Sequence, residues 1–198
     1  AADRADHEEK AALQSLAVQM TAETILGRAT IEAPRLTLRP VRASDAGLMT
    51  LYCADRRVAE MTTSIPHPLP PGTAEGFIAQ VTRPESDEAA WAMDATEMGG
   101  SELMGVISLK RMDRGQSEIG YWVAPALWNT GFASEAVNAL VAANPLENKT
   151  IFASVFQDNP GSARVLTNAG FEYLGDAEAY SVARGAKVPT WTYLKRLG

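Results

Sequence analysis

The clearest hydrophobic pattern of the chain lies within Ser117–Asn144. Apolar side chains first alternate at Ile119, Tyr121 and Val123, and Pro125 follows shortly after. This period of two predicts a strand that ends at the proline. After a short connection, apolar residues return at the spacing of one helix face, which predicts a helix, at Ala133, Ala136, Val137, Leu140 and Val141.

The connection between this strand and this helix, Trp128–Ala133, contains one glycine and opens directly onto the helix. The first amides of a helix have no partner within it, and the macrodipole favours negative charge there, so the turn can bind an anion. Strand-turn-helix units that hold no ligand are common in α/β proteins. The turn also lacks the lysine of a nucleotide P-loop and the three glycines of a dinucleotide-binding turn.

Alternating runs predict further strands on both sides of this unit. Those before it are Arg35–Arg42, Ala90–Thr96 and Glu102–Met112, the last of which leads through a turn into Ser117–Ala124. The last three of these four strands form an expected antiparallel meander. We predict a β-bulge at Gly105 and an edge or bulge position at Pro40.

Helices are predicted in the first half of the chain as well. Ser44 or Asp45 can cap a helix whose apolar residues are Leu48, Leu51, Tyr52 and Val58, and helix-like residues return at Thr73–Val81. Four prolines make the intervening Thr62–Gly72, which contains His67, a loop. A histidine titrates in the range useful for a base, but a lone loop histidine is usually a surface residue.

The C-terminal part continues with a strand at Thr150–Asp158 and a short helix. Asn159 is the expected N-cap of that helix, Pro160 its first residue and Gly170 the residue just past its end. Two final strands, joined around Arg184 and Gly185, are expected near Tyr173–Val182 and Thr190–Leu197.

The N-terminal residues 1–33 form a separate unit in this prediction. A weak helical stripe at Leu13, Leu16, Ala17 and Met20, with Gly27 as a stop, favours a helical extension packed on the domain or on a partner subunit. A single domain is expected over residues 34–198.

Composition narrows the class of protein. The 198 residues are 46% apolar and 21% charged, as in an ordinary soluble domain. A net charge of −6 argues against nucleic acid as the main partner and suits an amine substrate, although a solvated acidic surface explains it equally well. Cys53 is the only cysteine, which excludes a disulfide framework and a thiolate metal cluster. No apolar run reaches membrane-spanning length and the charged N-terminus lacks a signal-peptide core, so we expect a cytoplasmic enzyme that binds no membrane.

Two segments carry a resemblance to a known family. Residues 122–140, WVAPALWNTGFASEAVNAL, resemble the acyl-CoA pyrophosphate segment of the GNAT acetyltransferase superfamily, which follows a strand ending in V-x-P and reads [QRW]-G-x-G-x-[AG]. Residues 159–171, NPGSARVLTNAGF, resemble its second hallmark, N-x-x-S/A followed eight residues later by G-F. The resemblance covers about Arg35 to Leu197 and is strongest to the Rim-type branch, which acetylates protein N-termini and also contains enzymes for small amines.

The resemblance implies a fold and a co-substrate. The fold is α+β, with a mixed, mostly antiparallel twisted sheet of about seven strands flanked by helices. The co-substrate is acetyl-CoA, and no metal is implied. The residues implied to bind it are Val123, Ala124, Asn129, Thr130, Gly131, Phe132, Ala133, Ser134, Asn159 and Ser162.

These residues differ in their implied roles. The amides of residues 129–134 hold the pyrophosphate, and a backbone amide of Val123 or Ala124 polarises the thioester carbonyl. Asn159 either caps its helix or binds the pantetheine amides. Asn129 stands where the family usually has glycine, and asparagine is the next-best residue for a left-handed backbone.

The catalytic candidates are a base and an acid. Glu118 is the best candidate base for a weakly basic amine, with an exposed strand carboxylate as the alternative reading and Glu178 as a second candidate. Many family members protonate the leaving thiolate with a tyrosine, at whose position this chain has Leu166. Ser162 is the substitute that the Rim-type branch suggests, and Tyr180 is a further candidate.

Acetyl transfer to a primary amine, either a protein N-terminus or a small molecule, is therefore the expected function of a monomer or homodimer. A non-catalytic acyl-CoA-binding or regulatory module is the alternative, because Leu166 and Asn129 depart from the family pattern. A nucleotide-binding α/β protein is a third reading, which the missing P-loop lysine disfavours.

Overall fold

The computed structural model describes residues 10–15 and 29–198 of the chain. Residues 10–15 form a short helix in which Leu13 is exposed. The rest of the helical stripe predicted for the N-terminal extension, and Gly27, lie outside the described residues. Ile31–Glu32, which the sequence assigned to that extension, instead form strand β1 at the edge of the sheet. Within the described residues, no helix has the length and apolarity needed to cross a membrane.

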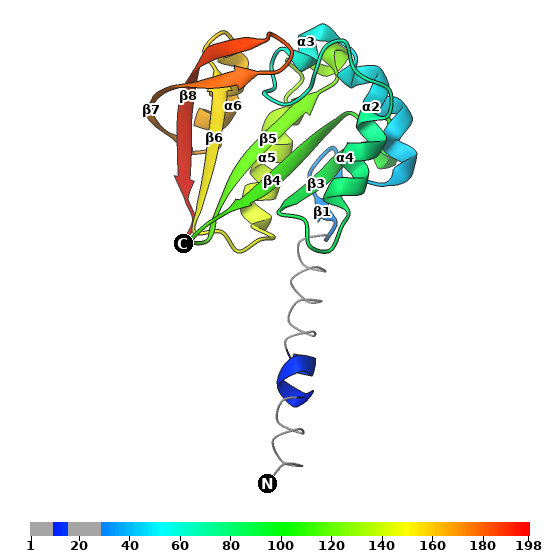
Figure 1. The fold of residues 1–198 in the computed structure, drawn as a ribbon, viewed down its shortest axis with the longest axis vertical. Helices are drawn as coiled ribbons and strands as arrows, with labels where there is room; N and C mark the ends of the chain where they lie inside the picture. The colour runs from blue at the N-terminus through cyan, green and yellow to red at the C-terminus, as the bar shows by residue number, and fades with distance from the viewer. Residues whose placement is uncertain (1–9, 16–28) are drawn as a thin grey trace.

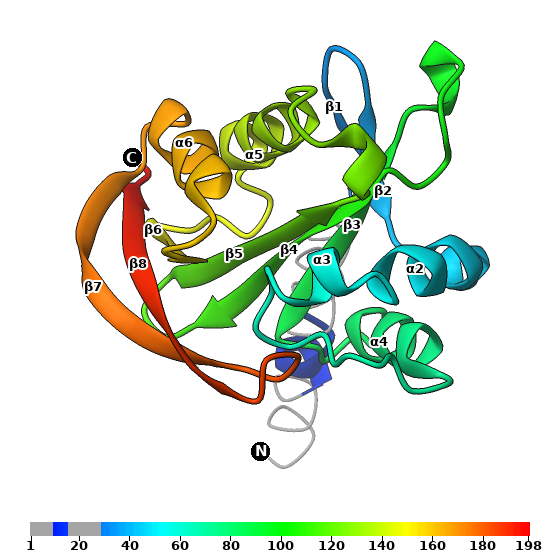
Figure 2. The same cartoon turned by 90° about the horizontal axis from the view of Figure 1, so that it is seen from above.

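From Ile31 onward the chain builds a sheet with helices on both faces (Figures 1 and 2). The strands are β1 (Ile31–Glu32), β2 (Thr37–Pro40), β3 (Glu88–Asp94), β4 (Gly105–Met112), β5 (Gln116–Val123), β6 (Thr150–Phe156), β7 (Glu172–Ser181) and β8 (Ala186–Arg196). The helices are α2 (Ala46–Cys53), α3 (Arg56–Ala59), α4 (Thr73–Val81), α5 (Phe132–Ala143) and α6 (Pro160–Asn168), with 3-10 turns η1 (Ala43–Asp45), η2 (Thr96–Met98) and η3 (Pro125–Leu127).

The strands form one eight-stranded sheet in the order β1-β2-β3-β4-β5-β6-β8-β7. Each neighbouring pair is antiparallel except β5 and β6, which run parallel. The expected α+β fold with a mixed, mostly antiparallel sheet is therefore confirmed. The sheet has one strand more than the expected seven because β1 was not anticipated.

Strands β5 and β6 are paired over a short distance only. Their register joins Gln116–Glu118 to Thr150–Phe152, although β5 continues to Val123 and β6 to Phe156. Figure 1 shows the two strands diverging from the end of the sheet that lies near the C-terminus. The parted strands leave the backbone edge of β5 without a strand partner where it approaches helix α5.

Each face of the sheet carries its own hydrophobic core. Helices α5 and α6 cover one face, where Val137, Leu140 and Leu166 are almost fully buried (Figure 2). Helices α2 and α4 cover the other face, where Met49 and Ile78 are buried. The helical stripe predicted for α5 is thus confirmed, and the sheet between the two cores provides a rigid support for the turns at its end.

At Gly105 the ladder between β4 and β5 is regular, since Gly105 pairs with Val123. Toward β3 the register ends at Val106, and the Met104 amide donates to the Met93 carbonyl at 2.8 Å, one residue out of register, next to the predicted bulge. A Cβ atom at Gly105 would lie 2.3 Å from the Trp122 carbonyl oxygen and 3.0 Å from Met93 Sδ. The glycine therefore permits close packing, which is the other common reason for a glycine within a strand.

The predicted side-chain cap of helix α2 is absent, because Asp45 has stronger partners. Its buried carboxylate accepts hydrogen bonds from Arg39 Nη1 and Nη2 at 2.9 and 2.8 Å and from the Arg42 amide at 2.9 Å. Arg39 also donates to Asp94 at 2.7 Å. Charge-assisted bonds of this kind are stronger than a cap to a neutral amide, so the carboxylate turns toward the arginine.

Two element boundaries also differ from the prediction. The helix expected to reach Val58 ends at Cys53, because Asp55 accepts a bond from the Arg57 amide and starts α3 as a new helix. Strand β8 begins at Ala186 rather than near Thr190, since antiparallel pairing with β7 extends the strand through a proline.

Candidate functional site

The turn before helix α5, residues 129–134, presents backbone amides to solvent. Asn129 and Gly131 both have left-handed backbones, with φ of 59° and 84°. This conformation was predicted for Asn129, which stands where the family usually has glycine. The first backbone bond of the helix runs from the Glu135 amide to the Gly131 carbonyl, and no side chain caps the helix. The three preceding amides, of residues 132–134, therefore have no partner within the helix and can bind an anion.

Arg35 fastens this turn from outside. Its Nη2 donates to the Thr130 carbonyl at 3.0 Å, and its guanidinium lies 4.3 Å from the centre of the Phe132 ring. Its Nε donates to the Glu135 carboxylate at 2.7 Å, and its amide donates to the same carboxylate. Glu135 is thereby neutralised beside the open amides, so its charge opposes a bound anion less. Sequence reasoning missed this residue, because nothing local shows that Arg35 meets the turn.

Val123 directs its backbone groups into the gap between the parted strands. The Ala124 amide donates to the Met104 carbonyl at 2.9 Å. Backbone groups of successive residues in an antiparallel strand point to opposite sides, so those of Val123 point away from β4. The Val123 carbonyl accepts a bond from the Trp128 indole at 2.8 Å rather than from β4. Because β6 pairs with β5 only as far as Glu118, the Val123 amide faces the gap. Of the two predicted amide donors, Ala124 is thus occupied and Val123 is suitably directed.

A pair of hydroxyl groups bridges β5 and helix α6. Tyr121 Oη lies 2.6 Å from Ser162 Oγ, and either atom can be the donor. Burial raises the pKa of Tyr121 to about 12. Asn159 caps α6 by accepting the Ser162 amide at 3.4 Å through Oδ1, which leaves its side-chain amide group available. Tyr121 was seen in the sequence only as a strand residue.

The three other polar candidates do not join this hydroxyl pair. Glu118 is exposed and points to the opposite face of the sheet from Tyr121, since the two are an odd number of residues apart on one strand. It is paired with Phe152 at the point where β5 and β6 part. Glu178 and Tyr180 lie on the edge strand β7 and are exposed. Among the described contacts, none joins these three residues to the Tyr121–Ser162 pair.

The turn between β7 and β8 is fastened to the segment after helix α3. Arg184 donates to the Glu60 carbonyl at 2.7 and 3.0 Å and to Asp158 at 2.5 and 3.1 Å. The Val182 amide donates to the Thr63 carbonyl at 3.1 Å. Figure 2 shows this turn beside the loop that follows α3. These contacts bring the start of the predicted Thr62–Gly72 loop next to the C-terminal hairpin.

Histidine 67 lies within that loop and is half-buried. Its Nδ1 has no hydrogen-bond partner among the described residues. No described contact joins His67 to Ser162, Tyr121 or Glu118, and among the described residues no group of three metal-ligating side chains is found.

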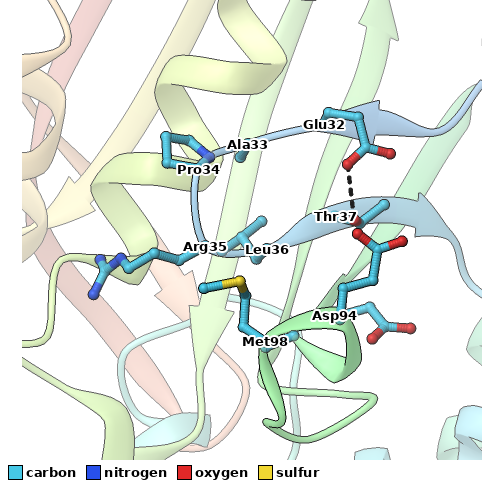
Figure 3. Close-up of a pocket in the computed structure, with 10 residues that line it drawn as sticks. Glu32, Ala33, Pro34, Arg35, Leu36, Thr37, Asp94 and Met98 are labelled. Carbon is cyan, nitrogen blue, oxygen red and sulfur yellow. Dashed lines mark hydrogen bonds between the residues drawn. The ribbon is translucent and has the colours of Figure 1, made fainter.

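A pocket opens between β1, β2 and η2 (Figure 3). Its charged lining includes Glu32, Asp94 and Glu97, together with the exposed Met98. Figure 3 shows the Arg35 side chain pointing away from these acidic groups, and its hydrogen bonds lead to the α5 turn. The pocket thus shares the β1–β2 connection with the α5 turn but does not contain the open amides.

Comparisons with known proteins agree with this geometry. The acetyltransferase (GNAT) domain family matches residues 35–172. The uncharacterized N-acetyltransferase p20 of Bacillus licheniformis is 27% identical over 173 residues, which cover 84% of this chain and 97% of that protein.

Solved structures share the fold. RimL, a ribosomal L7/L12 alpha-N-protein acetyltransferase in complex with coenzyme A, has a TM-score of 0.74 at 14% identity, covering 85% of this chain and 98% of its own. The spermidine N-acetyltransferase of Vibrio cholerae, in complex with CoA and spermine, has a TM-score of 0.66 at 18% identity, covering 81% and 95%. Fold neighbours thus include a Rim-type enzyme, as the sequence resemblance indicated. Because the family match spans most of the chain and its hallmark segments form the α5 turn and the start of α6, this protein belongs to the GNAT acetyltransferase family.

Proposed function

We propose that this chain transfers an acetyl group from acetyl-CoA to a primary amine, by direct attack of the amine within a ternary complex. The observation that carries the proposal is the gap between β5 and β6, with the open amides of the α5 turn at one end and the Tyr121–Ser162 pair inside it. A thioester carrier whose arm is joined to a diphosphate matches this arrangement, because the amides can bind the diphosphate while the arm lies in the gap.

The donor is held mainly by main-chain groups. The pyrophosphate lies against the amides of residues 132–134, with Asn129, Thr130 and Gly131 shaping the turn. The pantetheine arm follows the free edge of β5, where the Val123 amide donates to the thioester carbonyl as it gains negative charge. Asn159 offers its side-chain amide to the pantetheine amides from the start of α6.

The acceptor must lose a proton to react. A peptide α-amine has a pKa of about 8, so roughly a tenth of it is neutral at pH 7, and a weak base is enough to help it. Glu118 lies where the strands part, on the face opposite the donor, and is the base in this proposal. Ser162 donates to the departing sulfur from the other face.

The acceptor class is a primary amine on a protein N-terminus or on a small molecule. RimL is named for a protein α-amine, and the Vibrio cholerae enzyme for spermidine, so this fold accommodates both kinds. The acidic net charge of this chain favours approach of a cationic amine.

The decisive experiment measures thiol release from acetyl-CoA with peptides of different N-terminal residues, polyamines and aminoglycosides. We expect release with at least one amine, and Glu118→Gln is expected to lower kcat/KM by about 100-fold at neutral pH. Glu172→Gln, an exposed change on β7, is the matched control. CoA binding without any release supports a non-catalytic module, and a protein that does not bind CoA contradicts the proposal.

A further inference from the structure

The Tyr121–Ser162 pair has a geometry suited to acting on the sulfur of the donor. Tyr121 lies two residues before Val123 on β5, about 7 Å further into the gap. Its hydroxyl is 2.6 Å from Ser162 Oγ and 3.4 Å from the Ser162 carbonyl, so it is held to the first turn of α6. Tyr121 therefore ties the strand that carries the Val123 amide to this first turn of α6.

The two hydroxyl groups differ in what they can donate. Tyr121 is largely buried, and burial raises its pKa to about 12, so it keeps its proton at neutral pH. A serine hydroxyl has one proton and two lone pairs. When Tyr121 donates to Ser162 Oγ, the serine proton is free to point toward a third atom.

At the position of helix α6 where many family members carry a tyrosine, this chain has Leu166. Leu166, four residues after Ser162 and therefore on the same side of the helix, is 1% exposed and belongs to the core. The tyrosine hydroxyl that many family members carry on this helix is thus missing. Tyr121 brings a hydroxyl to the same helix from the facing strand.

We propose that Tyr121 is a positioning residue that holds Ser162 Oγ with its proton directed at the thioester sulfur while the C–S bond breaks. This inference rests on the proposed function. The amine nitrogen forms the new N–C bond, and the electron pair of the C–S bond moves to sulfur. The amine loses one proton and the sulfur gains one, so the hydroxyl pair undergoes no net change. The positive end of α6 adds to the stabilisation of the thiolate.

The first test measures the pKa of the thiol of bound CoA, from thiolate absorbance as a function of pH. The variants are Tyr121→Phe, Ser162→Ala and the double variant, with Tyr193→Phe as a matched control in the same core. Loss of a hydrogen bond to the thiolate raises the thiol pKa by about one, a tenfold change in the ratio of thiolate to thiol. We expect this rise in the first three variants and none in the control.

The second test separates turnover from binding. We expect kcat to fall by about 10-fold in Tyr121→Phe and about 100-fold in Ser162→Ala, with KM for acetyl-CoA changing less than about threefold. The double variant is expected to be no slower than Ser162→Ala, because the two groups act as a unit. A purely structural tyrosine would instead lower stability while leaving the thiol pKa unchanged.

The outcomes distinguish this inference from the proposed function. If wild-type protein does not bind CoA, the proposed function fails. If acetyl transfer proceeds while Tyr121→Phe matches Tyr193→Phe in thiol pKa and kcat, only the role of Tyr121 is overturned. If Tyr121→Phe does not fold, Ser162→Ala provides the test. An unchanged thiol pKa in Ser162→Ala would show that the Tyr121–Ser162 pair does not act on the sulfur.

Discussion

Two turns of this molecule are each held in place by an arginine. In one case the arginine comes from another segment, and in the other it belongs to the turn itself. At the α5 turn, Arg35 lies over the Phe132 ring at 4.3 Å. At the β7–β8 turn, Arg184 lies over the Phe156 ring at 4.9 Å. Each arginine also pairs with a carboxylate and donates to a main-chain carbonyl.

The direction of attachment is the difference. Arg35 comes from the β1–β2 connection and grips the α5 turn, whereas Arg184 belongs to its own turn and grips the segment after α3. The first arrangement sets the shape of a turn whose amides must fit one anion. The second sets where a hairpin lies relative to the loop after α3. Under the proposed function, the same interaction serves donor geometry at one turn and acceptor access at the other.

Of the variants that test the difference between the two turns, Gly131→Val is expected to have the largest effect, on the Kd for CoA. A β-branched residue is strained at φ 84°, and its Cβ would lie 3.1 Å from Arg35 Nη2. The turn must then rearrange and lose two or three bonds to phosphate, which raises the Kd for CoA by about 100-fold or more. Gly185→Val is the matched control, because Gly185 has φ 64° and no atom within 4 Å of its added Cβ. Calorimetry showing equal losses in both variants contradicts the donor role of the α5 turn.

Arg35→Ala is expected to weaken CoA binding by about tenfold, since the turn loses its fastening but keeps its amides. Arg35→Lys keeps the charge without the planar fork and should recover only part of the loss. The same calorimetric titration measures both. Full recovery by lysine would show that charge alone matters and that the geometry of the grip does not.

Arg184→Ala is expected to change KM for the amine by about three- to tenfold while leaving the Kd for CoA unaltered, because the hairpin is held to the segment after α3 and not to the α5 turn. Thiol release at saturating acetyl-CoA gives the first quantity and calorimetry the second. Arg83→Ala, at an exposed position after α4, is the control. A loss of CoA affinity in Arg184→Ala would remove the distinction between the two turns.

The smallest effect concerns stability and pH. The hydrogen bond from Arg184 holds the pKa of Asp158 below its ordinary value. A lowered folded-state pKa contributes stability above the unfolded pKa of about 3.9, and this contribution is lost as pH falls through the folded pKa. The Asp158 side chain is 53% exposed, so Asp158→Asn should cost only about 0.3–1 kcal/mol at pH 7.

Urea denaturation at pH 7 and below pH ~3 measures this difference. We expect the wild-type protein and Asp158→Asn to converge at the lower pH, where the carboxylate is protonated. A gap that persists or widens there would mean that Asp158 stabilises the protein through something other than its charge.

What could be predicted from the sequence was local. The α5 turn, the left-handed Asn129 and the Asn159 cap all depend on residues within a few positions of one another. Hydrophobic periodicity and turn chemistry report on that range. Gly105 shows the limit, because its close packing against Trp122 and Met93 involves neighbours that the local sequence does not reveal.

The contacts between residues far apart in the sequence could not be predicted. Arg35 meets Thr130 across 95 positions, and Tyr121 meets Ser162 across 41. Arg184 reaches the Glu60 carbonyl across 124. No sequence pattern around these residues indicates their partners, because each contact depends on the order of the strands in the sheet and not on neighbouring residues.

The brief ladder between β5 and β6 has a consequence for how such proteins diversify. Within the sheet, the ladder that joins β1–β5 to the last three strands has only three residue pairs. The segment from β6 onward should therefore be interchangeable between relatives as a cassette that brings its own Asn159, Ser162 and C-terminal hairpin to an unaltered α5 turn. Chimeras joined just before Thr150 would retain the same thioester carrier while inheriting the amine selectivity of the C-terminal parent.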